Sequence, residues 1–340
     1  MYTSTVTQFE EPPKKKPVNE ITVEPISAVD EPAAEQPLIW RNIIGILILH
    51  IFAFYSFATK CHEAKLWTWI FSPLYGIAAG VGITGGAHRL WAHRSYSAKV
   101  PLRILLAYLY CMAGQTHMSK WIRDHRTHHR YTETHADPHN SNRGFFFSHV
   151  GWLMMRRHPA VIKYGSKIDM SDVKSDPVIK FFDKYYTPIM LFLAFVLPTL
   201  IPVYCWNESW SISFRAVIIR YVWLLNATFL VNSFAHMWGN RPYNKTTKPT
   251  ENPTVAFFTL GEGWHNYHHA FPWDYKAAEL GAYALNPTTA FIDFMARFGL
   301  AYDLKKPNKE LVERISRSKG DGTESLWGNN YHSHHSTIVE

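Results

Sequence analysis

The stretch HRTHH, residues 125–129, places three histidines within five positions, directly after the sequence WIRD. Positions i, i+3 and i+4 of a helix lie on one face, so His125, His128 and His129 can present three imidazoles toward one point. The chain holds 19 histidines, so a single cluster does not establish a site. The surrounding sequence has to decide whether this one binds a metal.

Four apolar segments flank this cluster, each long enough to cross a hydrocarbon core of ~30 Å, which takes about 20 residues. Short polar links join the first segment to the second and the third to the fourth, which predicts two helical hairpins. The stretch VPLRILLAYLYCMAGQ is shorter and contains Arg103, so we expect a helix on the membrane interface. The sequence therefore predicts an all-α membrane protein with four transmembrane helices, at residues 39–59, 67–87, 186–206 and 214–235.

Basic residues set the predicted orientation. The segment 88–185 holds sixteen lysine or arginine residues, whereas the first short link holds Lys60 and Lys65 and the second holds none. The positive-inside rule places this segment and both termini in the cytosol. We expect residues 88–185 and 236–305 to form a cytosolic helical cap, which explains the net charge of +8 without nucleic acid.

The two ends differ in composition from the rest. Residues 1–37 are rich in Pro, Glu, Lys and Thr and are expected to be a disordered cytosolic arm. Residues 306–340 are expected to be a flexible cytosolic tail, and its YHSHH ending is not expected to be a site. Residues 38–305 then form the folded domain.

Two further histidine clusters lie at the same predicted depth as HRTHH, near the cytosolic ends of the spans. His236 ends the fourth span at that depth, with Asn232 one turn earlier. Nine imidazoles exceed the roughly four to six ligands of one metal and suit two. The predicted ligands are His88, His93, His125, His128, His129, His236, His265, His268 and His269.

The residue types restrict the metal. Structural zinc sites usually include cysteine, and none lies near these histidines. Carboxylate-bridged di-iron proteins use paired ExxH motifs, and only Glu262 and His265 have that spacing. Imidazole suits iron, zinc, copper and nickel. Iron is preferred if the task is oxidation, because zinc has no redox chemistry.

The stretches GITGGAHRLWAHRSY, WIRDHRTHHRYTETHADPHN, RGFFFSHVGW, LNATFLVNSFAHMWGNRPY and GEGWHNYHHAFPWDY resemble the membrane fatty acyl-CoA desaturases of animals, especially insect forms of the stearoyl-CoA desaturase type. The resemblance covers about residues 38–305. It implies a mushroom-shaped fold with a kinked acyl tunnel beneath two irons. It also implies two ligand sets: His88, His93, His125, His129 and His268 for one iron, and His128, His236, His265 and His269 for the other, with Asn232 acting through a water.

The resemblance also implies the partners. The substrate is a fatty acyl-CoA, and electrons pass from NADH through cytochrome b5 reductase to a separate cytochrome b5. The implied place is the endoplasmic reticulum membrane. The family pattern points to residues that bind the CoA moiety or line the tunnel: Asn42, Gln115, Trp121, Arg123, Arg156, Arg157, Thr228 and Phe229.

This chain departs from the family pattern at several of the implied substrate positions. The usual QNxxYEWxRDHR is QTHMSKWIRDHR here, so Lys120 stands where a glutamate is common, and Phe229 replaces a tryptophan. Gly76 and Gly80 precede His88 in the second span. We expect them to leave room at the blind end of the tunnel, although small residues also serve helix packing in membranes. These positions leave a Δ9 or a Δ11-like double bond open.

Two alternatives remain at this point. A conjugase or a hydroxylase would use the same ligands. A histidine-rich membrane metal transporter would need polar residues within the spans, and these are nearly free of carboxylates.

Overall fold

The computed structural model describes residues 36–279 and 283–324. The predicted disordered arm lies almost entirely outside these residues, as do the three histidines of the tail ending. Within the described chain the fold is helical, apart from one antiparallel pair of two-residue strands, β1 (Ser97–Ala98) and β2 (Ala301–Tyr302).

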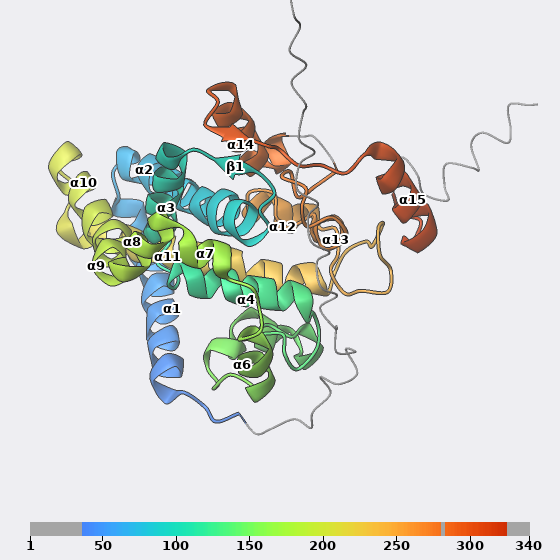
Figure 1. The fold of residues 1–340 in the computed structure, drawn as a ribbon. Helices are drawn as coiled ribbons and strands as arrows, with labels where there is room; N and C mark the ends of the chain where they lie inside the picture. Colours follow the sequence, from blue (N-terminus) through green and yellow to red (C-terminus); the bar gives the residue numbers. More distant parts are fainter. Residues whose placement is uncertain (1–35, 280–282, 325–340) are drawn as a thin grey trace, which may run out of the picture.

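Four helical segments are long and apolar enough to cross a membrane, as the sequence predicts (Figure 1). Several combine an α-helix with a 3-10 or π segment. They are Trp40–Glu63 (α1, Trp40–Lys60, with η2, Cys61–Glu63), Leu66–Ala92 (α2, Leu66–Val81, with η3, Gly82–Ala92), Tyr186–Trp206 (α9, Tyr186–Leu191, with η6, Phe192–Val196, and α10, Leu197–Trp206) and Trp210–His236 (α11, Trp210–Asn232, with η7, Phe234–His236).

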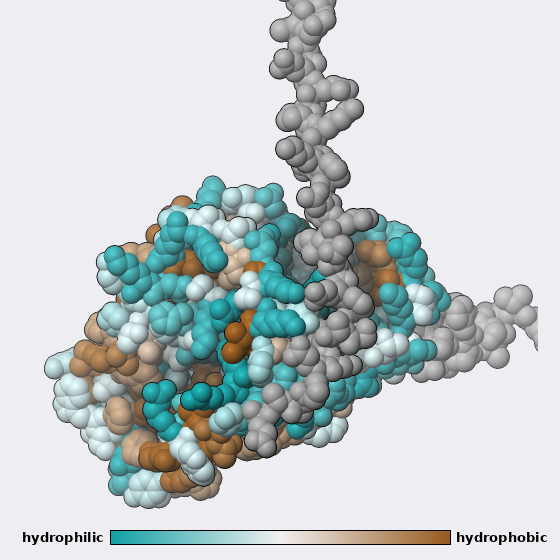
Figure 2. Space-filling model, turned by 60° about the horizontal axis from the view of Figure 1, so that its bottom comes forward, coloured by the Kyte–Doolittle hydropathy of each residue, from teal (hydrophilic) through white to brown (hydrophobic). Residues whose placement is uncertain are grey.

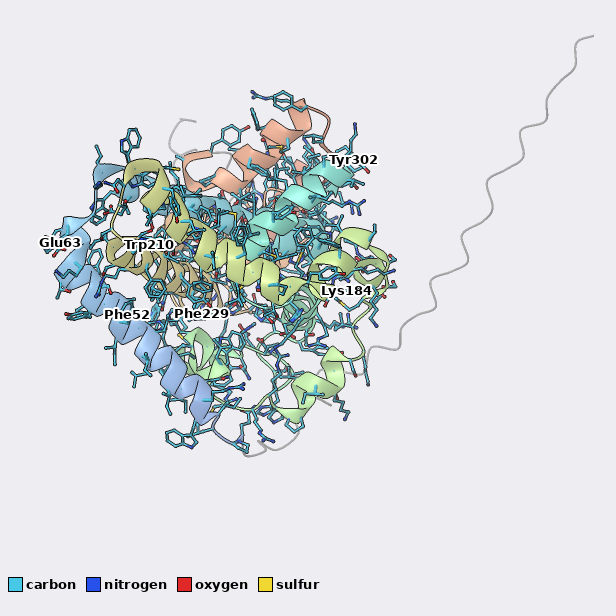
Figure 3. All side chains as sticks on the ribbon, turned by 90° about the vertical axis from the view of Figure 1, so that its left-hand side faces the viewer. Phe52, Glu63, Lys184, Trp210, Phe229 and Tyr302 are labelled. Atoms are coloured by element: carbon cyan, nitrogen blue, oxygen red, sulfur yellow. The ribbon has the colours of Figure 1, made fainter. Side chains whose placement is uncertain are left out.

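The two hairpin turns meet at one end of the bundle. The backbone N–H of Lys65 donates to Glu208 across 2.9 Å, and the Lys65 ammonium donates to the carbonyl of Asn207. Figure 3 shows the same arrangement, with Glu63 and Trp210 at one end of the molecule and Lys184 toward the other. The prediction of two hairpins is therefore confirmed.

The C-terminal part of the second span is a π-helix, η3, which begins at Gly82. Gly82 is where this segment crosses α3 (Val100–Met112), and a Cβ on Gly82 would lie 2.1 Å from the backbone nitrogen of Tyr110. Only glycine permits this approach. The predicted interfacial helix is α3, and its position relative to the bilayer stays a prediction.

The remaining elements form the cap around the ends of the second and fourth spans (Figure 1). Most are short, and only α4, α14 and α15 exceed ten residues. The cap helices are α4 (Met118–Arg130), α5 (Phe145–His149), α6 (Pro159–Gly165), α7 (Ser171–Ser175), α8 (Pro177–Lys184), α12 (Pro253–Phe258), α13 (His265–Ala270), α14 (Pro287–Arg297) and α15 (Lys309–Lys319), with the 3-10 turns η4 (Ser141–Arg143), η5 (Gly151–Leu153) and η8 (Tyr283–Leu285).

Helix α15 lies in the segment for which the sequence analysis expects a flexible tail. Val312 is buried against Tyr243, Tyr267 and Phe271. The Asn308 side chain caps the helix by accepting from the backbone N–H of Leu311 across 2.9 Å. This part of the chain is therefore docked on the cap.

The surface divides into an apolar and a polar part. Figure 2 shows hydrophobic residues gathered toward the left of the molecule, the side on which α1, α9 and α10 lie in Figure 1. Exposed apolar side chains on these helices include Leu47, Phe54, Leu191 and Tyr204. Such a surface suits lipid contact.

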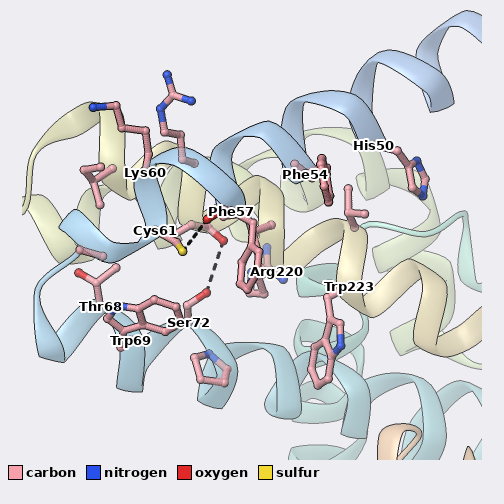
Figure 4. A pocket seen from close by; sticks show the side chains of 18 of the residues that line it. His50, Phe54, Phe57, Lys60, Cys61, Thr68, Trp69, Ser72, Arg220 and Trp223 are labelled. Carbon is pink, nitrogen blue, oxygen red and sulfur yellow. Dashed lines mark hydrogen bonds between the residues drawn. The ribbon is translucent and has the colours of Figure 1, made fainter.

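A groove of about 680 Å³ lies between α1, α2 and α11 (Figure 4). Phe57, Trp69 and Trp223 line it, and the Ser72 hydroxyl donates to the Ala216 carbonyl across 3.4 Å. None of the nine predicted ligand histidines lines it. The groove faces the region expected to hold lipid, and the histidine clusters lie elsewhere.

Candidate metal centre

Two groups of histidines converge where the second and fourth spans enter the cap. In the first group the ligand atoms of five histidines lie within 4.8 Å of one another; in the second the same holds for four. The groups come from η3 and the residue that follows it, and from α4, η7 and α13. Their members are His88, His93, His125, His129 and His268 in the first, and His128, His236, His265 and His269 in the second.

The structure explains the HxxxxH spacing, which a regular helix does not. In an α-helix of 3.6 residues per turn, positions 88 and 93 would point about 140° apart. η3 is a π-helix, whose bonds join residues five apart. The N–H of His93 donates to the carbonyl of His88 across 3.0 Å, and the two ring centroids lie 4.9 Å apart.

The two HxxHH clusters are each divided between the groups. On α4, His125 and His129 join the first group while His128 joins the second. On α13, His268 joins the first group while His265 and His269 join the second. The residue pattern suggests one shared point for each cluster, and this is wrong: both helices lie between the two groups. The division is the one that the family resemblance implies.

Carboxylates orient two of these imidazoles. His88 Nδ1 lies 2.9 Å from Glu262 Oε2, and His128 Nδ1 lies 2.9 Å from Asp137 Oδ1. His236 Nδ1 lies 3.6 Å from Glu133, too far for a hydrogen bond, so no carboxylate of the described chain orients this ring. A proton held on Nδ1 by a carboxylate leaves the Nε2 lone pair free, which is the usual arrangement of metal-binding histidine.

Glu262 is itself held by a buried arginine. Arg89 is fully buried, and its Nη2 donates to Glu262 Oε1 across 2.8 Å. Burial alone would raise the pKa of Glu262, but Arg89 and His88 outweigh it and lower the pKa to about 2. Glu262 is therefore an anion fixed between a buried cation and the first group.

The same surroundings keep most of the histidines neutral. Burial, followed by neighbouring histidines, lowers the pKa of the imidazoles that lie outside the spans far below the usual value; these are His93, His125, His129, His265, His268 and His269. His128 differs, because Asp137 raises its pKa against the opposing effect of burial. Neutral imidazole is the form that binds a metal.

The distances between ring nitrogens test whether a metal fits. Nε2 of His268 lies 3.0 Å from Nε2 of both His88 and His129, and Nε2 of His265 lies 3.0 Å from that of His236. Two nitrogens bound ~2.1 Å from one metal at right angles would be ~3.0 Å apart. In the described chain, the buried His128 Nε2 has no hydrogen-bond partner. The donor sets therefore fit metal ions.

Two cavities meet at the first group. The inner one, of about 70 Å³, is bounded by Gly80, Leu224 and Leu260; the outer one, of about 250 Å³, is bounded by Arg157 and Phe229. Four residues line both: Trp121, His125, Thr228 and Asn232. The two cavities therefore adjoin one another beside the histidines.

A hydrogen-bonded triad lies at the junction of the two cavities. Gln115 donates to the Thr228 hydroxyl across 2.8 Å and accepts from the Trp121 indole across 2.9 Å. Gln115, Thr228 and Trp121 therefore hold one another in place beside the histidines.

The other predicted substrate residues are placed differently. Arg156 lines a separate small hollow, and Asn42 donates to the carbonyl of Leu153 across 2.8 Å. Arg123 lines neither of the two cavities. Gly76 also lies outside them and faces Arg220, whose Cγ would be 3.4 Å from a Cβ at this position.

The sequence analysis missed Asp137, Glu133 and Arg89, and treated Glu262 only as half of an ExxH pair. A usable signal was present, because metal-binding histidines commonly donate to carboxylates. Asp137 and Glu133 follow HRTHH within nine residues of His128. His128, Asp137 and His139 form a further set whose ligand atoms lie within 4.8 Å of one another. This set arises from the contact between His128 and the Asp137 carboxylate.

Comparison with known proteins supplies the family. The fatty acid desaturase family model matches residues 64–288. The chain belongs to the fatty acid desaturase family. The prediction of an oxidoreductase of this kind is thereby confirmed.

Several curated desaturases are similar over most of their length. An acyl-CoA Δ9 desaturase of Acheta domesticus is 53% identical over 308 residues, with 88% of this chain and 86% of that protein covered. An acyl-CoA Δ11 desaturase of Trichoplusia ni is 50% identical (85% and 83% covered), and the human stearoyl-CoA desaturase is 50% identical (86% and 81% covered). Desaturases named for different bond positions thus resemble this chain almost equally.

Proposed function

We propose that this desaturase inserts a double bond into a fatty acyl chain presented as its CoA thioester, at a centre of two irons. The observation that carries this proposal is the division of nine histidines into two groups beside two adjoining, largely apolar cavities. The first group would hold one iron. The second would hold the other, with Asn232 nearby through a water.

Two irons would supply oxidation of an unactivated methylene with dioxygen, which acid–base chemistry of side chains does not provide. The side chains of the protein would bind the acyl chain, position it and exclude water. The inner cavity, bounded by Leu224, Leu260 and Gly80, would take the apolar end of the acyl chain. The triad of Gln115, Thr228 and Trp121 would hold the bend of the chain against the first group.

The carboxylates Glu262 and Asp137 keep His88 and His128 in the tautomer that directs Nε2 inward. The apolar lining of the inner cavity would exclude water from the reacting carbons. At the outer end, Arg157 and its neighbours would face the CoA moiety. The position of the double bond would follow from how far the tail enters the inner cavity.

Electrons would come from NADH through cytochrome b5 reductase and a separate cytochrome b5. The protein would lie in the endoplasmic reticulum membrane, with the cap and both termini cytosolic. The excess of basic residues in the segment 88–185 supports this orientation.

The test is expression in yeast that lacks its own desaturase, with double-bond position read by mass spectrometry of the cellular lipids. We expect growth without added unsaturated fatty acid. A conjugated diene or a hydroxylated chain as the main product would contradict the proposal. Purified protein with acyl-CoA and dioxygen should turn over only after cytochrome b5 and its reductase are added, and iron should be the bound metal.

A further inference from the structure

Lys120 stands at the mouth of the outer cavity, in the first turn of α4. It lines this cavity together with Asp124, one turn later, and Arg157. Its side chain is exposed. The path from Lys120 continues past Trp121 to His125 of the first group.

The charges around Lys120 are unbalanced. Both terminal nitrogens of Arg157 donate to the two oxygens of Asp124, one of them across 2.7 Å. Arg123 also approaches this carboxylate, at 3.4 Å. Lys120, Arg123 and Arg157 therefore lie near a single carboxylate, which leaves two positive charges in excess here.

Asp124 is occupied by Arg157, so it does not neutralise Lys120. Among the described residues, the Lys120 ammonium has no salt bridge within 4.0 Å and no hydrogen bond. Although the residue reaches solvent, partial burial in the cavity wall and then the charge of Arg157 lower the pKa of Lys120, and Asp124 opposes them only in part. An anion bound here would relieve this repulsion.

We infer that Lys120 binds a phosphate of the CoA moiety at the mouth of the outer cavity. This inference rests on the proposed function. Phosphates are the strong anions of an acyl-CoA, and the acyl tail would occupy the opposite end of the path. A lysine contributes a point charge that suits phosphate without a fixed geometry. Since the family pattern commonly has glutamate at this position, Lys120 adds a contact particular to this chain.

The test measures binding without turnover. Full-length protein purified in detergent, with no electron donor, is titrated with stearoyl-CoA and separately with S-stearoyl pantetheine, which lacks phosphate. We expect Lys120→Glu to weaken stearoyl-CoA binding about tenfold, the loss of one charged contact and its replacement by repulsion. Binding of S-stearoyl pantetheine should be unchanged. Added salt should narrow the difference, because the mouth is open to solvent.

Two variants serve as controls. Lys120→Arg keeps the charge and should bind stearoyl-CoA within about twofold of the unmodified protein. Lys180→Glu makes the same charge reversal on an exposed residue of α8 outside both cavities, and should bind normally.

The outcomes separate this inference from the proposed function. If Lys120→Glu binds stearoyl-CoA as tightly as the unmodified protein, the inference is overturned while the function stands. An equal loss for both ligands would also overturn it, because the effect would then be one of shape. If the unmodified protein binds no stearoyl-CoA, the proposed substrate falls, and the inference with it.

Discussion

The backbone N–H of His93 donates to the carbonyl of His88 across 3.0 Å, which makes the two histidines neighbours on one π-helical turn. Because of this bond, two histidines five residues apart both point into the first group. A π segment of this kind is uncommon and is often found at functional sites. It adds one residue to the turn without ending the membrane-spanning helix, so His93 reaches the cap while His88 stays at the end of the span.

Two adjacent histidines should lose metal to different extents. His128 belongs to the group of four and His129 to the group of five. His128→Ala leaves three imidazoles and should lose about half of the bound metal, whereas His129→Ala leaves four and should lose less. Both should abolish desaturation, because the proposed reaction needs a metal in each group. Metal content by plasma mass spectrometry, after equal dialysis against a chelator, checks this.

The double variant of His128 and His129 should retain less metal than either single variant. If one site held both residues, the double variant would empty that site alone and would still keep the other metal bound. Membrane insertion should be intact in all three. Deletion of residues 326–340, with the tail histidines His332, His334 and His335, should leave metal content and activity unchanged.

Asp137→Asn should weaken the second group without removing a ligand. Asp137 is buried and accepts from His128 Nδ1, so the neutral amide lowers the basicity of this imidazole. Loss of such a carboxylate typically costs 10- to 100-fold in metal affinity, roughly. A competitive chelator titration measures it. Asp169→Asn, a change at an exposed carboxylate, is the matched control, and equal affinities in the two variants would refute the role of Asp137.

Some of the architecture could be predicted from the sequence because it depends on local pattern. The four spans follow from apolar length, and the observed bounds differ from the predicted ones by a few residues. The second span continues to Ala92, five residues beyond its predicted end, because the π turn of η3 extends the helix. Helix α15 also had a local signal, since Asn308 precedes the apolar residues Leu311, Val312 and Ile315.

The division of the histidines could not be predicted from spacing alone. Helical periodicity places His125, His128 and His129 on one broad face, and does not say that α4 lies between two centres. Only the packing of η3, η7 and α13 around α4 assigns each ring. The contact between Arg89 and Glu262 joins residues 173 positions apart, so no local pattern reveals it.

Glu251→Gln should stabilise the cap at high pH. Glu251 accepts from the N–H of Tyr267 across 2.7 Å. Burial, together with Glu324 and Glu279, raises the pKa of Glu251 to about 8 against this hydrogen bond. The folded chain therefore binds this proton more tightly than the unfolded chain, whose carboxyl has a pKa near 4.5. The stability it contributes is full below about pH 4.5 and is lost as the pH rises through 8.

Glutamine keeps the accepting oxygen and removes the charge. The melting temperature of the variant should exceed that of the unmodified protein by on the order of a few degrees at pH 8.5, and the gap should shrink toward pH 5.5. Thermal unfolding across this range measures it. Glu310→Gln, at an exposed position of α15, should show no such trend. If the melting temperatures of Glu251→Gln and the unmodified protein differed by the same amount at every pH, the raised pKa of Glu251 would be refuted.

Gly80→Ala should shift chain-length preference, whereas Gly76→Ala should not. Gly80 borders the inner cavity, and a Cβ there would lie 2.7 Å from Leu260 Cδ1, so Leu260 must move and the cavity changes shape. A Cβ on Gly76 would meet only the Arg220 stem, at 3.4 Å, outside the cavity. If the acyl tail ends beside Gly80, its alanine variant should favour shorter acyl-CoAs or move the double bond along the chain. Competition between acyl-CoAs of different length, with products read by mass spectrometry, gives the profile. Identical profiles for both folded, active variants would mean that the tail does not reach Gly80, and that both glycines serve only the packing of α2 against its neighbours.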